Sequence, residues 1–305
     1  MSLKYGVIGS GAIGGYYGGM LARSGEEVHF LFHSDYDYVK KHGLKIDSVN
    51  GNFKLPSVLA YNKSSDMPKC DVVFVCLKST NNKLLKELLP PLLHQDTVVI
   101  LIQNGFGLEA DLQKDFPNLN IAGGLAFICS NKTGDGHITH LDYGKLNIGS
   151  YSCTDTNILE KVHSDFRQAD IETHIVELYS ARWMKLVWNI PFNGMTVVLN
   201  TTTDKLMTNI NTDLLINQMM LEVIQAANRA GCSISESYAD EMMDMTRKMT
   251  PYSPSMKLDF DSHRQLEIDY IYSRPIEEAA KNGYDMKYVS MLEKQLRFIE
   301  AQYLK

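Results

Sequence analysis

The sequence predicts an α/β fold followed by an all-helical region, and three observations carry this prediction. A strand-like apolar run over residues 4–8 ends in a glycine-rich turn that opens a helical pattern. Strand-like and helical patterns then alternate as far as residue 176. From residue 180 onward the pattern is helical with polar breaks. We therefore expect two domains, at 1–178 and 179–305, in a chain of 305 residues that is long enough for both.

The glycine turn has the spacing G-x-G-x-x-G at Gly9, Gly11 and Gly14, between a strand and a helix expected over 16–23. The first glycine permits a sharp turn, the second lets the backbone approach a pyrophosphate, and the third lets the helix pack on the strand. The helix then directs unpaired N–H groups at the phosphates. A plain glycine-rich turn is the alternative, which the strand–turn–helix context disfavours. The predicted dinucleotide-binding residues of this turn are Gly9, Gly11, Ala12, Ile13 and Gly14.

The end of the second expected strand, 27–32, bears on the choice of cofactor. An NAD site usually has Asp or Glu there for the ribose 2′-hydroxyl, whereas an NADP site prefers positive or neutral groups for the 2′-phosphate. This chain has His33 and Ser34, with Asp35 one step beyond. The pattern leans to NADP and makes His33 a candidate cofactor contact. The alternative is that Ser34 or Asp35 only caps the helix expected over 36–41.

Two continuous apolar runs, at 71–77 and 97–102, are typical of strands buried on both faces of a parallel sheet. Polar residues follow both runs, at Lys78 and at Asn104. Because open α/β sheets bind ligands at the carboxyl ends of their strands, we interpret Lys78 as a ligand contact rather than a solvated loop charge. For Asn104 a site role and a simple turn role are equally supported.

The remaining patterns of this half predict shorter elements. His137 and His140 lie in a glycine-punctuated, alternating stretch that predicts antiparallel strands. With no third ligand at useful spacing, exposed strand positions are the better interpretation of this histidine pair than a metal site. The other elements expected here are strands at 44–48 and 53–58 around a turn at Asn50 and Gly51, a helix at 81–89, an apolar segment at 121–130, a helix at 157–168 and a strand at 172–176.

The first helix of the second half, expected over 181–199, carries Lys185, Asn189 and Asn193 four residues apart and therefore on one face. The flanking residues are too apolar for this to be simply a solvated stripe. Pro191 removes one helical hydrogen bond and tends to kink a helix, so Asn193 is expected to stack imperfectly above Asn189. Further helices are expected at 213–230, 235–248, 265–282 and 286–304.

Composition excludes several classes of function. The net charge is −6 with no basic block, which does not support nucleic-acid binding. No stretch approaches the roughly 18 apolar residues of a membrane helix. The N-terminus runs into a strand without a secretory segment, which predicts a cytoplasmic protein. The five cysteines include no C-x-x-C pair, so we expect a reducing compartment and neither a disulfide framework nor a metal site.

Taken together, these features resemble the ketopantoate reductase family (2-dehydropantoate 2-reductase) over essentially the whole chain. The resemblance implies a Rossmann domain followed by an all-helical domain, with the active site in the cleft between them. It also implies NADPH-dependent reduction of 2-dehydropantoate to pantoate in pantothenate biosynthesis. The motifs that carry it, in the order of the family, are Gly9-x-Gly11-x-x-Gly14, Leu77-Lys78, Asn104-Gly105, Lys185-x3-Asn189-x3-Asn193, Ser255-Met256 and Glu267-Ile268-Asp269-Tyr270.

Site roles follow from the resemblance position by position. Lys185 is similar to the catalytic lysine of the family, in contact with the substrate, and Glu267 to its second catalytic residue. Lys78 resembles a cofactor contact, and Asn104 a contact to both cofactor and substrate. The remaining implied substrate contacts are Asn189, Asn193 and Ser255. The expected partner is a small keto acid, and a homodimer stays open.

Two departures from the family leave alternatives open. His33 stands where the family often has arginine, which puts strict NADP preference in question, and Thr203 aligns with a family asparagine. A reductase of a related 2-keto acid is one alternative, and a non-catalytic NADP-binding regulatory protein is another. The joint presence of Lys185 and Glu267 favours an enzyme. Glu267 has its own alternative, an ion pair with Arg264 on a solvated helix face.

Overall fold

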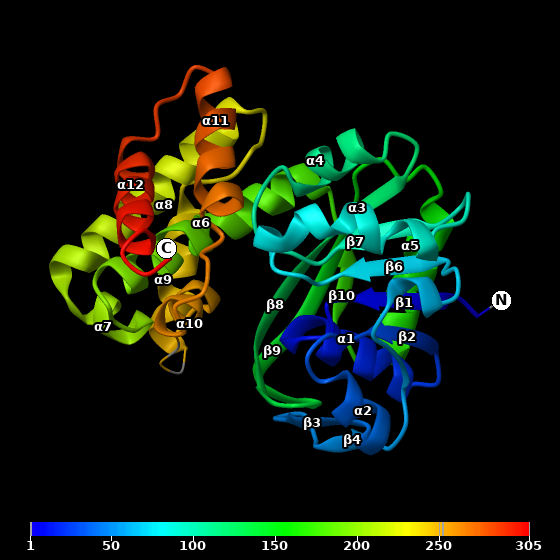
Figure 1. Cartoon of the computed structure of the whole chain (residues 1–305). Helices are drawn as coiled ribbons and strands as arrows, with labels where there is room; N and C mark the ends of the chain where they lie inside the picture. Colours follow the sequence, from blue (N-terminus) through cyan, green and yellow to red (C-terminus); the bar gives the residue numbers. More distant parts are fainter. Residues whose placement is uncertain (1, 250, 252, 305) are drawn as a thin grey trace. The chain divides into compact units, whose positions relative to one another are not determined.

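The computed structural model describes residues 2–249, 251 and 253–304. It comprises two compact units, Met1–Gln103 with Leu108–Leu178, and Asn104–Gly107 with Tyr179–Lys305 (Figure 1). Strands alternate with helices in the first unit, and the second is helical. The predicted fold class is therefore confirmed. The short segment Asn104–Gly107 belongs to the helical unit, although the sequence analysis assigned it to the first domain.

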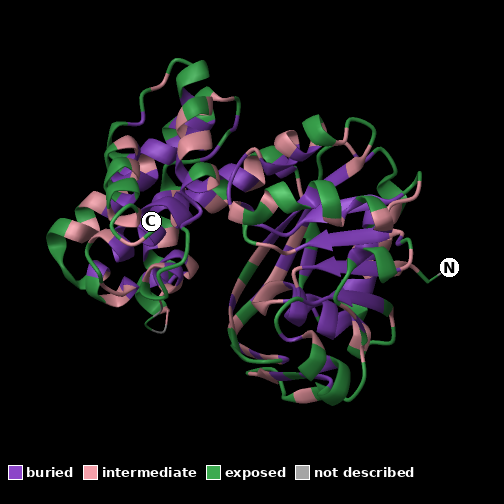
Figure 2. Cartoon of the chain, viewed as in Figure 1, coloured by how far each residue is buried: buried purple, intermediate pink, exposed green. Residues whose placement is uncertain are grey.

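Within the described residues, the first unit is built on one sheet with the strand order β4-β3-β9-β8-β7-β6-β1-β2-β5, and β10 pairs with β9. Its central strands β2, β1, β6 and β7 are parallel and almost wholly buried (Figure 2). The strands are β1 (Lys4–Ile8), β2 (Glu27–Leu31), β3 (Leu44–Ser48), β4 (Phe53–Leu55), β5 (Leu59–Tyr61), β6 (Val72–Val75), β7 (Val98–Leu101), β8 (Asn120–Gly134), β9 (His137–Ser150) and β10 (Thr173–Ile175).

The helices of this unit are α1 (Ala12–Arg23), α2 (Tyr36–His42), α3 (Leu85–Leu88), α4 (Leu108–Asp115) and α5 (Thr156–Gln168). Most of the expected helix at 81–89 is wrong, because Ser79–Leu84 forms a 3₁₀ segment and only Leu85–Leu88 is α-helical. The Asn82 side chain bonds Gln103 instead of facing solvent. The expected strand at 53–58 ends at Leu55, before a proline, and a separate strand follows at Leu59–Tyr61.

The prediction of exposed histidines on the β8–β9 hairpin is wrong for His140. Its ring is 1% exposed and packs against Tyr16, with ring centroids 4.5 Å apart. Its Nδ1 bonds the Ser48 hydroxyl at 2.8 Å. His137 is half-buried and its Nε2 lies 2.6 Å from Asp47. Each histidine therefore connects β9 to β3, and no group of three potential metal ligands occurs among the residues described.

The helical unit contains α6 (Leu178–Val198), α7 (Thr203–Thr208), α8 (Ile210–Arg229), α9 (Ser237–Lys248), α10 (Ser255–Asp261), α11 (Arg274–Lys281) and α12 (Lys287–Glu300). The helix expected over 265–282 begins differently, since Asp269–Ser273 is a π-helical turn, labelled η4, that leads into α11. Helix α6 continues through Pro191. None of the helices described is both long and apolar enough to cross a membrane.

The N-terminus of α12 is capped by a buried carboxylate from α8. Met286, the N-cap residue of α12, makes no side-chain capping bond. Instead, Glu222 accepts from the backbone N–H groups of Tyr288 at 3.1 Å and Val289 at 2.9 Å. Glu222 is 5% exposed, and burial raises its pKa while these N–H groups oppose that shift. A carboxylate at this place satisfies two donors that the helix cannot pair internally.

Replacing Glu222 with alanine should lower the free energy of unfolding of the helical unit by about 2–3 kcal/mol, because a hydrogen bond to a charged group contributes roughly 1.5–3 kcal/mol. Urea unfolding followed by tryptophan fluorescence measures this, since both tryptophans, Trp183 and Trp188, lie on α6. Glu241→Ala, an exposed glutamate on α9, is the control and should stay within about 0.5 kcal/mol of wild type. Equal values for the two variants would contradict the capping role.

Candidate functional site

The parallel strands of the first unit end in register. Ile8 pairs with Leu31 on one side and with Val75 on the other, and Val75 pairs with Leu101. The residues that follow these strands therefore lie at one edge of the sheet, where open α/β sheets bind ligands. Three of the predicted cofactor contacts, Gly9, His33 and Lys78, are placed there by the register.

The glycine turn is tightly packed at its first and third glycines and open at its second. Gly9 has a φ of +92°, and a Cβ on it would lie 2.7 Å from the Leu77 nitrogen. A Cβ on Gly14 would lie 2.4 Å from the Gly9 carbonyl oxygen, so no side chain fits between α1 and β1. Around Gly11 no described atom lies within 4 Å of such a Cβ. Gly11 is also the N-cap of α1 and has no side chain to offer its N–H groups.

Polar contacts fix the strand ends around this turn. The Ser10 hydroxyl donates to the Leu31 carbonyl at 3.0 Å, which holds the turn against the end of β2. The Gln103 amide, 5% exposed, donates to the Leu77 carbonyl at 2.8 Å and to the Asn82 side chain at 2.7 Å. The ends of β6 and β7 are thus joined directly.

The acidic residue near the end of β2 is engaged elsewhere. Asp35 is 4% exposed; it accepts from the Gly136 N–H at 3.1 Å and pairs with Lys132 at 2.9 Å. Asp35 is the N-cap residue of α2, as the alternative held, although its side chain makes no capping bond. His33 and Ser34 are exposed. The group nearest the strand end is therefore a histidine and not a carboxylate.

In the helical unit, Lys185, Asn189 and Asn193 lie along one face of α6 on either side of Pro191. Lys185 is half-buried, Asn189 is 7% exposed and Asn193 is 2% exposed. The Asn193 side-chain oxygen has no hydrogen-bond partner among the described residues. Leaving such a group unpaired in a protein interior costs roughly 1–3 kcal/mol. A helix face that keeps an unpaired buried amide oxygen fits ligand binding better than packing against another helix.

Lys185 is electrostatically coupled to Glu267. Burial, and then the positive charge of Arg182, lower the pKa of Lys185 to about 7, and the Glu267 carboxylate opposes this shift. Glu267 is 5% exposed, so the alternative of a solvated helix face is wrong. Arg264 donates instead to Asp259 at 2.9 Å. The structure therefore places the two residues predicted to be catalytic within reach of each other's charge.

The sequence analysis missed Arg182, which is 3% exposed. Its position one turn before Lys185, on the same helix face, was the available signal. A second cation so close favours a lysine that releases its proton near neutral pH.

Asn104 is held in the helical unit by its neighbours. The Phe106 N–H donates to the Tyr270 carbonyl at 2.8 Å, and the Phe106 ring packs on Trp183 with centroids 5.0 Å apart. Gly105 has a φ of +113°, and a Cβ on it would lie 2.6 Å from the Tyr270 Cβ. The segment that carries Asn104 is therefore anchored to η4. This turn begins at Asp269, two residues after Glu267.

Ser255 and Thr203 each begin a short helix of the same unit. Ser255 is half-buried at the start of α10, and Thr203 is 1% exposed at the start of α7. The assignment of these residues to the substrate site remains a prediction.

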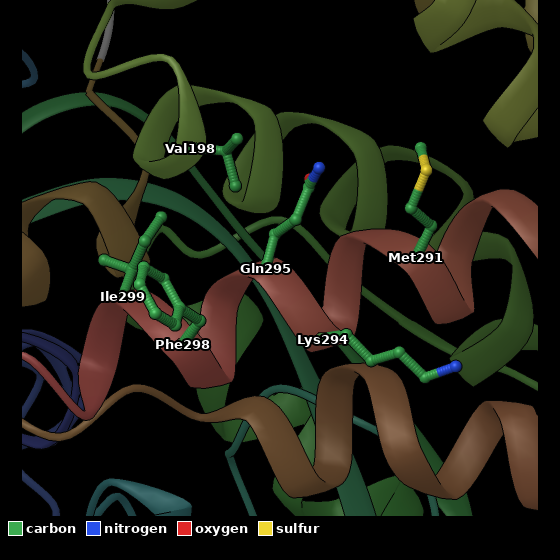
Figure 3. A pocket seen from close by; sticks show the side chains of 6 residues that line it. All are labelled: Val198, Met291, Lys294, Gln295, Phe298 and Ile299. Carbon is green, nitrogen blue, oxygen red and sulfur yellow. The ribbon is translucent and has the colours of Figure 1, made fainter.

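A hollow of about 390 Å³ lies on the α12 surface, and none of the predicted site residues lines it (Figure 3). It is lined by Val198, Met291, Lys294, Gln295, Phe298 and Ile299. A second hollow of about 380 Å³ near Cys232 likewise contains none of the predicted site residues.

Comparisons with known proteins find relatives along nearly the whole chain. The family described as ketopantoate reductase PanE/ApbA matches residues 5–152, and its C-terminal part matches residues 177–300. A 2-dehydropantoate 2-reductase of Nostoc sp. is 44% identical over 305 aligned residues, which cover 98% of this chain and 96% of the relative. A solved 2-dehydropantoate 2-reductase from Geobacter metallireducens is 39% identical, covers 97% of this chain and 99% of its own, and superposes with a TM-score of 0.94.

A more distant likeness extends only to the fold. A solved D-mandelate dehydrogenase, in complex with NADH and anilino(oxo)acetate, is 20% identical with a TM-score of 0.88. It covers 98% of this chain and 99% of its own. Because both units are matched by the family and close relatives align end to end, the chain belongs to the ketopantoate reductase family.

Proposed function

We propose that this chain reduces 2-dehydropantoate to pantoate, with NADPH as the hydride donor, in pantothenate biosynthesis. The observation that carries the proposal is a lysine whose pKa is lowered to about 7 beside a buried glutamate. When bound, the nicotinamide supplies the hydride. The residues of the chain then hold the substrate and manage the charge and the proton at its ketone oxygen.

Lys185 acts on the ketone oxygen. Negative charge grows on this oxygen as hydride is added to the neighbouring carbon, and an ammonium group stabilises that charge and donates the proton. A pKa near 7 makes the proton easy to give up at neutral pH, which is where a general acid is most effective. Arg182 contributes to the lowered pKa and Glu267 limits it, so the two charges together set the proton affinity.

The neighbouring polar groups suit a small hydroxy keto acid. The amides of Asn189 and Asn193 and the hydroxyl of Ser255 can donate to a carboxylate, and the Glu267 carboxylate can accept from a substrate hydroxyl. The unpaired oxygen of Asn193 offers a further acceptor. In this proposal Asn104 approaches both cofactor and substrate.

Three features of the first unit support a dinucleotide. Open space surrounds Gly11, α1 has no side-chain cap at Gly11, and the strand ends around Gly9 are fixed in register. NADPH is favoured over NADH because Asp35 is bound to Gly136 and Lys132 and leaves His33 and Ser34 at the strand end. Lys78 is proposed as a further cofactor contact.

The test of the proposed function is oxidation of the nicotinamide at 340 nm with 2-dehydropantoate, compared with a panel of other 2-keto acids. Thr203 motivates the panel, because it stands where the family often has asparagine. Turnover of another 2-keto acid at higher kcat/KM would favour the related reductase. Binding of NADPH without turnover of any of them would favour the regulatory alternative. The cytoplasmic location and the homodimer remain predictions.

Gly11→Ala should weaken NADPH binding by about tenfold or more without lowering the melting temperature. The new methyl group meets no described atom within 4 Å in the protein, yet it lies where the backbone must approach the pyrophosphate. Gly14→Ala is the contrasting variant and should lose stability, because its Cβ collides with the Gly9 carbonyl. Fluorescence titration and thermal melts separate the two effects. Unchanged NADPH affinity in Gly11→Ala would place the pyrophosphate elsewhere.

NADPH should bind more tightly than NADH by a modest margin. His33→Glu, which supplies an acceptor for the ribose 2′-hydroxyl and repels a 2′-phosphate, should reverse the preference. Titrations of both proteins with both cofactors check this. Equal dissociation constants throughout would show that the end of β2 does not select the cofactor.

The rate of ketone reduction should fall as the pH rises through about 7, because Lys185 then loses the proton that it donates. Lys185→Ala should lower kcat by about 10²–10⁴-fold at similar NADPH affinity. Glu267→Gln should move the fall in kcat/KM to lower pH, since the carboxylate that raises the Lys185 pKa is gone. Steady-state kinetics from pH 5.5 to 9 decide. A profile unaffected by the Glu267 substitution would disprove the coupling.

A further inference from the structure

The segment that carries Glu267 departs from ordinary helix geometry. Directly after Ile268, the residues Asp269–Ser273 form the π-helical turn η4 before α11 begins. Such turns are wider than an α-helix, occur mostly as single turns and are frequent at functional sites. The contacts that η4 makes with other elements are therefore informative.

The partners come from one face of α12. Glu293, Arg297 and Glu300 have the i, i+4, i+7 spacing of a single helix face. We call these three residues the α12 clamp. At its C-terminal end, the Glu300 carboxylate accepts from the Leu266 backbone N–H at 2.6 Å. This bond fixes the residue immediately before Glu267.

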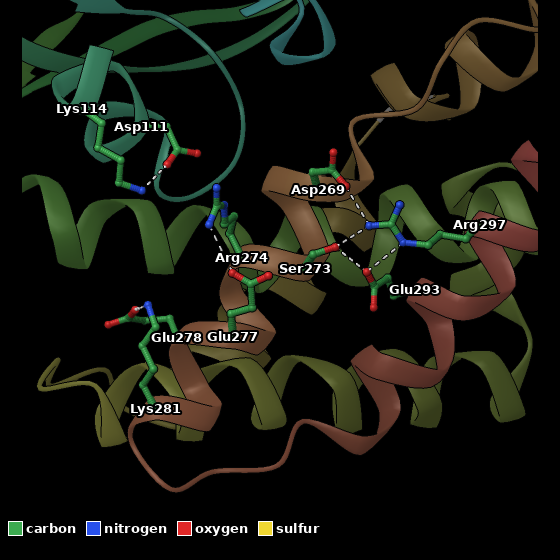
Figure 4. A network of polar contacts seen from close by, with 10 residues as sticks. All are labelled: Asp111, Lys114, Asp269, Ser273, Arg274, Glu277, Glu278, Lys281, Glu293 and Arg297. Carbon is green, nitrogen blue, oxygen red and sulfur yellow. Dashed lines mark hydrogen bonds and ion pairs between the residues drawn. The ribbon is translucent and has the colours of Figure 1, made fainter. Parts of the chain in front are cut away.

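The middle of the clamp fixes the turn itself (Figure 4). One Arg297 nitrogen, Nη2, donates to the Asp269 carboxylate and to the Ser273 hydroxyl, each at 2.7 Å. The Arg297 Nε donates to Glu293 at 3.1 Å, and Glu293 also accepts from the Ser273 hydroxyl. Nη2 thus bonds both ends of η4 while Nε binds Glu293, and the planar guanidinium holds these two nitrogens at a fixed spacing, which a single ammonium group cannot supply.

The same turn supports two other parts of the site. The Tyr270 carbonyl accepts from Phe106, which anchors the segment that carries Asn104. The buried Tyr272 hydroxyl donates to the Ile190 carbonyl at 2.9 Å, on α6 between Asn189 and Asn193. A shift of η4 would therefore be felt at Glu267, Asn104 and the polar face of α6.

We propose that the α12 clamp is a positioning element for catalysis, with Arg297 as its central residue, and that it holds Glu267 and Asn104 in place for the reaction; this rests on the proposed function. Its residues do not touch the substrate. The purely structural explanation treats these contacts as surface ion pairs, which contribute about 0–1 kcal/mol to stability. The two explanations differ in whether loss of Arg297 changes the site or only the stability of the fold.

Arg247 on α9 provides a matched control. Its side chain is 44% exposed, against 46% for Arg297, and it likewise bonds two carboxylates, of Asp213 and Asp244. Arg297→Ala should lower kcat/KM for the keto acid by about 10–100-fold, because small misplacements of reacting groups cost rates of this order. The NADPH dissociation constant should stay at the wild-type value, and Arg247→Ala should leave kcat/KM unchanged.

A second readout needs no turnover. The pH dependence of Lys185 modification by an amine-reactive reagent, followed by mass spectrometry, reports the Lys185 pKa in the free protein. The profile of Glu267→Gln measures how far the Lys185 pKa falls when the carboxylate is lost. Arg297→Ala should shift the profile in the same direction, because Glu267 is no longer held near the lysine, and Arg247→Ala should not. Arg297→Lys, which keeps the charge but loses the fork, should restore the profile only in part.

The outcomes separate this inference from the proposed function. A wild-type protein that leaves 2-dehydropantoate unreduced overturns the proposed function, and the Lys185 profile alone then decides the role of the clamp. If the pH profile of Lys185 modification in Arg297→Ala equals that of the wild type, the proposed role of the α12 clamp is wrong, even if the enzyme is active. Ser273→Ala, which removes one hydroxyl from the same network, replaces Arg297→Ala if that variant melts well below the Arg247→Ala control, and the same shift of profile is then required of it.

Discussion

The candidate site of the helical unit depends on one partly buried ammonium group, that of Lys185. Lys185 lies beside Arg182 on α6, and burial together with this second cation brings the Lys185 pKa down to about 7. The buried Glu267 carboxylate works in the opposite direction. Such a balance is sensitive to distance, because Coulomb interactions in a protein interior are weakly screened. The contacts of η4 with α6, with the Phe106 segment and with α12 can all be understood as fixing that distance.

Much of this architecture could be predicted from local sequence. The Gly9 turn, the buried runs that became β6 and β7, and the spacing of Lys185, Asn189 and Asn193 are signals carried by neighbouring residues, and the structure has the corresponding elements. The fold class and the family followed from them. Their roles in binding and catalysis remain predictions, because no ligand contact is needed to form a strand, a turn or a helix.

What could not be predicted depends on partners far away in the chain. Asp35 is the N-cap residue of α2, as its position suggested, but its side chain binds Gly136 and Lys132, about a hundred residues later. His140 looked like an exposed strand residue, but Tyr16 and Ser48 bury it. The π-helical turn after Glu267 has no local signature either, since its supporting contacts come from α12. In each case the long-range contact, and not the local propensity, determined the outcome.

The placement of Phe106 has a consequence for the order in which the protein assembles. Phe106 is made early, between β7 and α4, yet its ring completes a core with Trp183 and Tyr179 on α6. During synthesis the Phe106 side chain cannot make these contacts before α6 has left the ribosome. Contacts between residues so distant in sequence form late and slow folding. A fragment that ends near residue 178 would contain Phe106 without its aromatic partners. A fragment that begins at residue 179 would lack the Phe106 ring and leave a cavity beside Trp183. The two units therefore cannot be obtained intact by cutting the gene between residues 178 and 179.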